Sequence, residues 1–539
     1  MGKRKIVAAV SMLLAIGMGL SGCAHASTDQ TSASDANTLK IGTTDVVSAL
    51  DPAGASDTGS VMLMTQIYGQ LMNQKPGSSD PEPELAESGE FVNPTTYRVK
   101  LRKGLKFANG NPINAEAVKF SLDRQAGIND PNGPQLMKMA LKSTKIVDDL
   151  TVDCELNDAN DQTFPGILTA NDAAIVDPKV FGADKITSID DIIKGRGFSG
   201  PYELVSYSKG VAAKLKANAN YSGVIDKVKT DTVMVNYYSS EDNLKLNIQQ
   251  HNIDVAWNTL SAKDIETLGK DSSLKVHSAP GGSIRYLTFN FNTMPYGAQS
   301  DEPDAAKALA VRQAIADLVD RQAIADRVYK GTYVPLYSNV PDGITGATQP
   351  FKELYGDGNG GPDAAKAKKR LSDAGVKTPV NLNIQYNTDH YGASSADEYA
   401  LIKEQLESSG LFKVTIQSTE WSSYAKKYST GEFPIFQLGG SGEFSDGDDF
   451  LSIFYGKGNF LQNGYENEDV YRLLAAEKTE ADKTKRNEIL AQVQEQVAKD
   501  ISNLDLLQGQ QIAVAGTNVQ GVDNTLDGSF KFRLGVLSK

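Results

Sequence analysis

The acidic segment SGEFSDGDDF, residues 441–450, contains the side chains best placed to do chemistry. Glu443, Asp446, Asp448 and Asp449 all offer oxygen atoms, which are the ligands that hard cations such as Ca²⁺ prefer. The spacing of DGDD differs, however, from the D-x-[DN]-x-[DN]-G pattern of a calcium loop. Three interpretations therefore stay open: a metal site, a solvated acidic turn, or a ligand-binding loop that uses one carboxylate.

Motifs of known enzymes give little support for catalysis. GGSGE and GFSGP, residues 439–443 and 197–201, both lack the final glycine of the G-x-S-x-G nucleophile motif. The sequence has no H-E-x-x-H motif and no P-loop. The four histidines also lie in no recognisable motif: His25, His251, His277 and His390. We predict no catalytic residue, no cofactor and no metal, with a hydrolase that uses two carboxylates as the alternative.

Cys23 follows a segment typical of exported proteins. Lys3, Arg4 and Lys5 precede an apolar run, residues 6–20, whose length suits a signal peptide better than a membrane span. The segment LSGC resembles a bacterial lipobox, and this resemblance implies cleavage before Cys23 and lipidation of its thiol. An ordinary secretory cleavage nearby is the alternative.

The segment after Cys23 is rich in serine, threonine, alanine and aspartate and has no apolar period. We therefore expect a lipoprotein signal peptide over residues 1–22 and a flexible tether over residues 23–38. A disulfide from Cys23 to Cys154 would start in this tether, so we expect Cys154 to be a buried free thiol.

Composition limits the partners of this protein. The chain has 539 residues and a formal net charge of −13. Removal of residues 1–22 would make the charge more negative, because the only charged side chains in this segment are basic. An acidic surface disfavours nucleic acid and direct docking on anionic lipid. No second apolar run is long enough to span a membrane, and the length indicates more than one domain.

Alternating strand and helix patterns surround the acidic segment. Residues 380–387 and 412–418 alternate as strands do, residues 396–410 show helical spacing, and residues 421–431 are a short helix candidate. Residues 433–440 form a nearly continuous apolar run, which is typical of a buried strand. This order predicts βαβ units with right-handed crossovers in a doubly wound sheet. Such sheets bind ligands at the carboxyl ends of their strands, which is where the acidic segment begins.

An earlier region has a different pattern. Residues 96–113 predict a hairpin with its turn at Asn109–Gly110. Residues 114–124 predict a helix with Asn114 as its N-cap. A further strand–turn–strand pattern covers residues 145–156. Residues 77–195 therefore look like a small α+β domain.

Several long segments resemble, in order, the peptide/nickel-type (family 5) solute-binding proteins of ABC importers. The resemblance covers nearly the whole chain after the tether, and Asp320 is expected to cap the second of the family's paired helices. The segments are YGQLM, PEPELAESGEF, TYRVKLRKGLKFANGNPINAEAVKFSLDR, GFSGPYELVSYSKGVAAKLKANANYSG and VRQAIADLVDRQAIADRVYKGTYVPLYSNVP.

This resemblance implies an α/β fold of the periplasmic-binding-protein type II, with two lobes joined by a hinge and an inserted α+β domain. Lobe I would comprise residues 39–76, 194–283 and 508–539. The inserted domain would comprise residues 77–193 and lobe II residues 284–507. The hinge is expected near residues 282–287 and 504–508, and its motion would close the lobes on a ligand.

The resemblance also implies a position for a peptide's amino end. The family pattern runs tryptophan–x–alanine–aspartate–tyrosine, followed shortly by phenylalanine–leucine. Counting back from Phe450–Leu451 puts Glu443 at the aspartate and Phe444 at the aromatic residue. Gln437 stands where oligopeptide binders can carry an arginine for the peptide carboxylate.

The complete set of expected ligand-binding residues combines these positions with their neighbours. It consists of Gln437, Gly439, Ser441, Glu443, Phe444 and Trp257. Trp257 is either a core residue or a pocket wall. Arg285 and Lys426 are further candidates for a ligand carboxylate, and for both the alternative is a structural or solvated cation.

The sequence therefore predicts a monomeric protein that is lipid-anchored on the outer face of the cell membrane. It would capture a ligand, foremost an oligopeptide, and deliver it to an ABC permease. In a Gram-positive cell, which lacks an outer membrane, a lipidated Cys23 would keep the protein near that permease. The alternatives are an oligosaccharide or another small solute as ligand and, from another class, an extracellular hydrolase.

Overall fold

A computed structural model of the protein describes residues 38–128 and 130–539. Cys23 and the expected signal peptide lie outside the described residues, as does all of the expected tether except its last residue. The roles assigned to them therefore stay predictions. Within the described part of the chain, no helix combines the length and the apolar character that crossing a bilayer requires.

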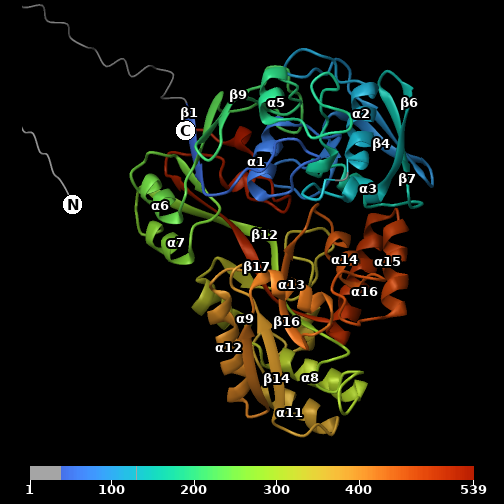
Figure 1. The fold of residues 1–539 in the computed structure, drawn as a ribbon, viewed down its shortest axis with the longest axis vertical. Helices are drawn as coiled ribbons and strands as arrows, with labels where there is room; N and C mark the ends of the chain where they lie inside the picture. The colour runs from blue at the N-terminus through green and yellow to red at the C-terminus, as the bar shows by residue number, and fades with distance from the viewer. Residues whose placement is uncertain (1–37, 129) are drawn as a thin grey trace, which may run out of the picture. The chain divides into compact units, whose positions relative to one another are not determined.

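An eleven-stranded mixed sheet runs through the described residues (Figure 1). Its main path has the order β15-β14-β16-β12-β17-β11-β1-β10-β9-β8, and β13 pairs with β17. The strands are β1 (Thr38–Thr43), β8 (Tyr202–Ser208), β9 (Ala212–Ala217), β10 (Thr232–Tyr237), β11 (Val255–Trp257), β12 (Leu274–Phe289), β13 (Tyr333–Pro335), β14 (Val380–Tyr386), β15 (Phe412–Ser418), β16 (Ile435–Ser441) and β17 (Asn503–Gly516). β14 pairs in parallel with both β15 and β16, which confirms the βαβ units predicted for this region.

β12 and β17 join the two ends of this sheet (Figure 1). The first half of β12 pairs with the half of β17 that lies beside β11, and its second half pairs beside β16. Between the two halves the register shifts, so that residues 281–283 of β12 stand opposite Gly509 alone, as in a β-bulge. An added Cβ at Gly282 would collide with the ring of Phe530, so a side chain at this position would force that ring to move. The bulge lies next to the predicted hinge segments, and the hinge motion itself stays a prediction.

Separate hydrophobic cores lie on the two sides of the bulge. The core on one side contains side chains of β1 and of β8 to β11 together with residues 513–537. The core on the other side consists of two hydrophobic clusters within residues 284–507. A further core, built mainly from residues 71–175, belongs to the four-stranded sheet β4-β5-β7-β6. Residues 176, 181 and 192 pack in the β1 core, although the sequence analysis places them in the inserted domain. The domain boundaries drawn from the sequence stay a prediction.

The inserted domain contains strands β4 (Ala86–Asn93), β5 (Thr96–Leu101), β6 (Leu141–Asp148) and β7 (Thr151–Leu156), and the short pair β2 (Met72–Asn73) and β3 (Glu82–Pro83) precedes it. The α-helices are α1 (Thr58–Ile67), α2 (Ala115–Gly127), α3 (Leu136–Ala140), α4 (Phe164–Ile167), α5 (Ile189–Gly195), α6 (Glu241–Gln249), α7 (Ala262–Leu268), α8 (Ala305–Leu318), α9 (Arg321–Ile324), α10 (Pro350–Leu354), α11 (Ala364–Asp373), α12 (Ser395–Ser408), α13 (Trp421–Ser429), α14 (Ser452–Tyr455), α15 (Glu468–Thr479) and α16 (Lys483–Asp500). Short 3₁₀ turns include η1 (Asn171–Ala173) and η3 (Asp448–Phe450).

Local sequence signals explain several of these boundaries. The side chain of Asn114 accepts a hydrogen bond from the amide of Ala117 and caps α2, and Asp320 caps α9 in the same way. Both caps confirm the predictions. The predicted hairpin over residues 96–113 is wrong in part, because β5 pairs with β4 and β7, and the Asn109–Gly110 turn closes only a single bridge. Cys154 is a free thiol buried in the inserted domain, as predicted, and burial raises its pKa to about 12.

Candidate ligand-binding site

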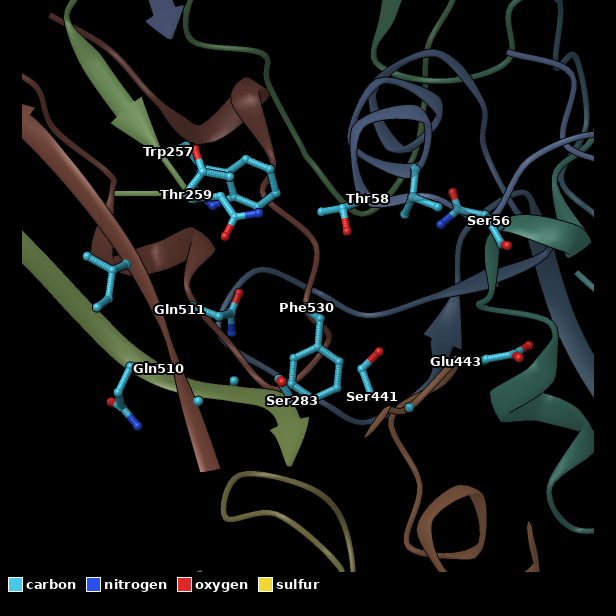
Figure 2. Close-up of a pocket in the computed structure, with 18 of the residues that line it drawn as sticks. Ser56, Thr58, Trp257, Thr259, Ser283, Ser441, Glu443, Gln510, Gln511 and Phe530 are labelled. Atoms are coloured by element: carbon cyan, nitrogen blue, oxygen red, sulfur yellow. The ribbon is translucent and has the colours of Figure 1, made fainter. Parts of the chain in front are cut away.

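A cavity of about 660 Å³ lies beside the bulge of β12 and β17 (Figure 2). Its walls come from the bulge itself, from residues 257–260 after β11, from residues 171–172 of the inserted domain, and from residues 441–443 after β16. Pockets of this size hold small ligands in many binding proteins. The sheet therefore places its strand ends around one ligand-sized space, as expected for a doubly wound sheet.

Ser441, Gly442 and Glu443 bring the carboxyl end of β16 to this cavity. The strand is buried up to Leu438 and becomes exposed at Ser441. Gly442 is required by packing, because an added Cβ would collide with the Asp449 carboxylate and the Phe450 ring. The side chain of Glu443 is exposed and extends toward the ribbon of the inserted domain in Figure 2, and partial loss of solvation raises its pKa.

The other carboxylates of the acidic segment hold the loop in place. Asp449 accepts hydrogen bonds from the amides of Glu443 and Phe444, at 2.6 and 3.2 Å. Both carboxylate oxygens of Asp446 accept from the guanidinium of Arg486 at 2.7 Å. Asp448 is buried, and this burial raises its pKa. Asp446 and Asp449 are therefore bonded within the protein, and Asp448 is buried. Glu443 is the carboxylate of the segment that lines the cavity.

Phe444 takes a different place from the one predicted for it. Its side chain is buried in the core of the inserted domain instead of lining the cavity. A Cβ added at Gly166 would lie 3.0 Å from the Phe444 ring, which shows how closely this ring packs against α4. Phe444 therefore docks the loop after β16 onto the inserted domain.

Gln437 and Gly439 lie on β16 before it reaches the cavity. The amide oxygen of Gln437 accepts from the amide of Asn387 at 2.9 Å, and its amide nitrogen donates to Ser395 at 3.1 Å. Gly439 packs against the ring of Tyr391. Neither residue lines the cavity, and Gln437 is a buried amide whose oxygen and nitrogen both have hydrogen-bond partners within the protein.

Arg285 and Lys426 also lie away from the cavity. The Arg285 guanidinium is buried, forms an ion pair with Glu398 at 2.6 Å and lies over the ring of Tyr329. Burial lowers the pKa of Arg285, but the negative charges around it, that of Glu398 foremost, more than offset this and leave the pKa raised. Lys426 is exposed on α13. For both residues the structure favours the alternative interpretation, a structural cation for Arg285 and a solvated one for Lys426.

Trp257 is both a core residue and a cavity wall. Its indole stacks on the ring of Phe532 with centroids 5.0 Å apart, and the residue also lines the cavity. The two residues that follow, Asn258 and Thr259, have φ values of 60° and 58°. A left-handed β-branched residue is rare and strained, and such strain gathers at binding sites. The hydroxyl oxygen of Thr259 is buried without a hydrogen-bond partner.

The sequence analysis missed Asn171 and Asp172, which form the cavity wall contributed by η1. Asp172 is only 2% exposed and accepts a hydrogen bond from the amide of Met137 at 2.8 Å. Burial, assisted by the negative charge of Glu443, raises its pKa to about 7. No local signal in the sequence marks Asp172, because its position depends on the contact between the inserted domain and the loop after β16.

Comparisons with a family model and with individual proteins point to the same protein family. Residues 80–462, well over half of the chain, match the model of the bacterial extracellular solute-binding proteins, family 5. The oligopeptide-binding protein OppA of Bacillus subtilis is 27% identical over 474 residues, which cover 82% of each chain. The dipeptide-binding protein of Escherichia coli is 25% identical over 72% of this chain and 73% of its own.

Solved structures show the same fold. HbpA2 from Haemophilus parasuis superposes with a TM-score of 0.77 at 22% identity, over 93% of this chain and 99% of its own. DppA from Helicobacter pylori, solved with the peptide STSA, gives a TM-score of 0.68 at 21% identity, over 93% and 98%. These similarities confirm the predicted two-lobed α/β fold of the periplasmic-binding-protein type II.

Proposed function

Because this chain belongs to the family 5 extracellular solute-binding proteins of ABC importers, we propose that it captures peptides with a free amino end in the cavity beside β16 and delivers them to an ABC permease. The peptide ligand of OppA and of the dipeptide-binding protein supports this choice of ligand class. Ligand capture in this account involves no chemical change of the peptide.

The placement of Glu443 is the observation that carries the proposal. This residue follows the end of β16 at Ser441, its side chain is exposed, and it lines the cavity. Among the described residues that line the cavity, none is a lysine, arginine or histidine that could neutralise it. A peptide ammonium would supply the missing positive charge through a charge-assisted hydrogen bond, which stabilises a complex by about 1.5–3 kcal/mol.

Calorimetry with the purified protein tests the proposal. We expect a mixed set of tri- and tetrapeptides to contain tight ligands, and acetylation of their amino ends to weaken binding roughly tenfold to a hundredfold, since about 1.4 kcal/mol is a factor of ten. Mass spectrometry of the ligand released by denaturation should recover the peptide unchanged. Equal binding of free and acetylated peptides would contradict the proposal, and so would cleavage of the ligand.

We further propose that Cys23 carries the membrane anchor. The basic residues 3–5, the apolar run and LSGC support this role, and two acyl chains hold a protein at a membrane where one holds it only weakly. Cys23→Ser should abolish acyl labelling and release the protein into the medium, which metabolic labelling and cell fractionation measure. Labelling that persists in Cys23→Ser would rule out this anchor.

A further inference from the structure

Asn171 and Asp172 of η1, which line the cavity, each carry one buried side-chain oxygen atom without a hydrogen-bond partner. One carboxylate oxygen of Asp172 accepts from Met137, but its second oxygen, Oδ1, is buried without any hydrogen-bond partner. The side-chain oxygen of Asn171 is likewise buried without a partner. Buried polar atoms in folded proteins nearly always have a partner, so two unpartnered acceptors on neighbouring lining residues fit a donor that a ligand supplies.

The charge at this wall points to a positively charged donor. Glu443 is the second carboxylate that lines the cavity, and its negative charge acts on Asp172. No cationic side chain of the described lining residues offsets the two groups. A buried carboxylate without a cationic partner is costly in free energy, and an ammonium or guanidinium would remove much of that cost.

The surroundings of Asp172 suit a long side chain. The helices α1 and α3 both pack against η1, and their residues Val61 and Leu136 line the same cavity together with Pro134. Lysine and arginine bury their methylene stems against apolar surface and present the charge at the end. The apolar residues therefore fit the stem, and Asp172 with Asn171 fits the charged end.

We propose that Asp172 and Asn171 form a subsite for a lysine- or arginine-like side chain of the bound peptide, so that the preferred substrates are peptides with a basic residue close to the amino end. This inference rests on the proposed function, because it takes the amino end to lie at Glu443. Asp172 determines specificity here by pairing with the ligand's side chain.

Matched peptides test the subsite by calorimetry. Lys-Ala-Ala and Ala-Lys-Ala are compared with the same peptides that carry norleucine, which keeps the stem and removes the charge. At pH 8 we expect lysine at one of the two positions to bind tenfold to a hundredfold more tightly than norleucine. Asp172→Asn should reduce this lysine-to-norleucine ratio at least tenfold, whereas Asp149→Asn, an exposed aspartate of the same domain, should leave the ratio as it is.

The wild-type protein provides a second test that needs no variant. Protonation of Asp172 removes the partner of the ligand's cation, so the advantage of lysine should shrink as the pH falls from 8 to 5. A lysine advantage that survives in Asp172→Asn, or that is independent of pH, would overturn the subsite. Equal binding of lysine and norleucine peptides, with acetylation still weakening both, would overturn the subsite and leave the proposed function standing. Failure of all free peptides to bind would overturn both.

Discussion

The carboxylates near the cavity are of two kinds. Asp446 and Asp449 are paired within the protein, with a guanidinium and with backbone amides. Glu443 and Asp172 line the cavity, and no cationic side chain of the described residues forms an ion pair with either. The first kind stabilises the loop after β16, and the second leaves negative charge for a ligand.

Of these two cavity-lining carboxylates, sequence alone predicted one. Glu443 lies just beyond the carboxyl end of β16, so the rule for strand ends locates it. Asp172 lies in a short turn of another domain, which packs against α1 and, through Phe444, against the loop after β16. Contacts between segments so far apart in the chain leave no periodic pattern in the sequence.

The unpaired state of Asp172 predicts a pH-dependent cost to stability. Its folded-state pKa of about 7 lies above its ordinary value of 3.8, so the folded protein binds the proton more tightly than the unfolded chain. The stabilising contribution is complete below about pH 4 and is lost as the pH rises through 7. Asp172→Asn removes this titration, and it should gain about 1–4 kcal/mol in unfolding free energy over wild type between pH 4.5 and pH 8.

Urea unfolding at the two pH values measures this gain, with Asp149→Asn as the control for loss of an exposed charge. A cationic partner within the protein would produce the opposite sign. If Asp172→Asn loses stability relative to wild type as the pH rises, Asp172 is a structural ion-pair residue and the subsite has no unpaired charge to offer.

At the scale of elements, periodic patterns in the sequence predicted the strands whose side chains alternate between core and solvent or are continuously buried. The alternation in residues 380–387 and 412–418 gave β14 and β15, and the apolar run gave β16. The course of β12 was harder to predict, because Pro280 and two glycines indicate the end of a strand. The strand continues past them because Pro280 still pairs in register with Gln510, and the bulge leaves only the two glycines and Ser283 outside the β12–β17 ladder.

The loop after β16 depends on Phe444 for its position. Phe444→Ala removes a buried ring from the core of the inserted domain, and such changes cost about 3–5 kcal/mol in unfolding free energy. Because this ring joins the loop to α4, hydrogen exchange should become faster in residues 442–449 and 164–168. Phe460→Ala is the matched control, since that ring is 39% exposed. Equal effects of the two changes would show that Phe444 does not dock the loop.

At the scale of the whole described chain, contacts beyond the bulge connect the two sides of the cavity. Lys478 of α15 pairs with Asp158 of the inserted domain at 2.7 Å, and Ser445 donates to the carbonyl of Gly528 at 2.7 Å. The ion pair is partly exposed, and such pairs contribute only about 0–1 kcal/mol, so this pair can break and form again at low cost. That property suits a protein that must release what it binds.

The most direct test of the central claim is a double-mutant cycle between Glu443 and the ligand's amino end. Calorimetry compares wild type and Glu443→Gln, each with a free and an N-acetylated peptide, and exposed Glu466→Gln serves as the control. We predict that each single change weakens binding roughly tenfold to a hundredfold and that both together cost little more than one, a coupling of about 1.5–3 kcal/mol. Strictly additive losses would contradict the account, because they would show that Glu443 does not meet the amino end of the peptide.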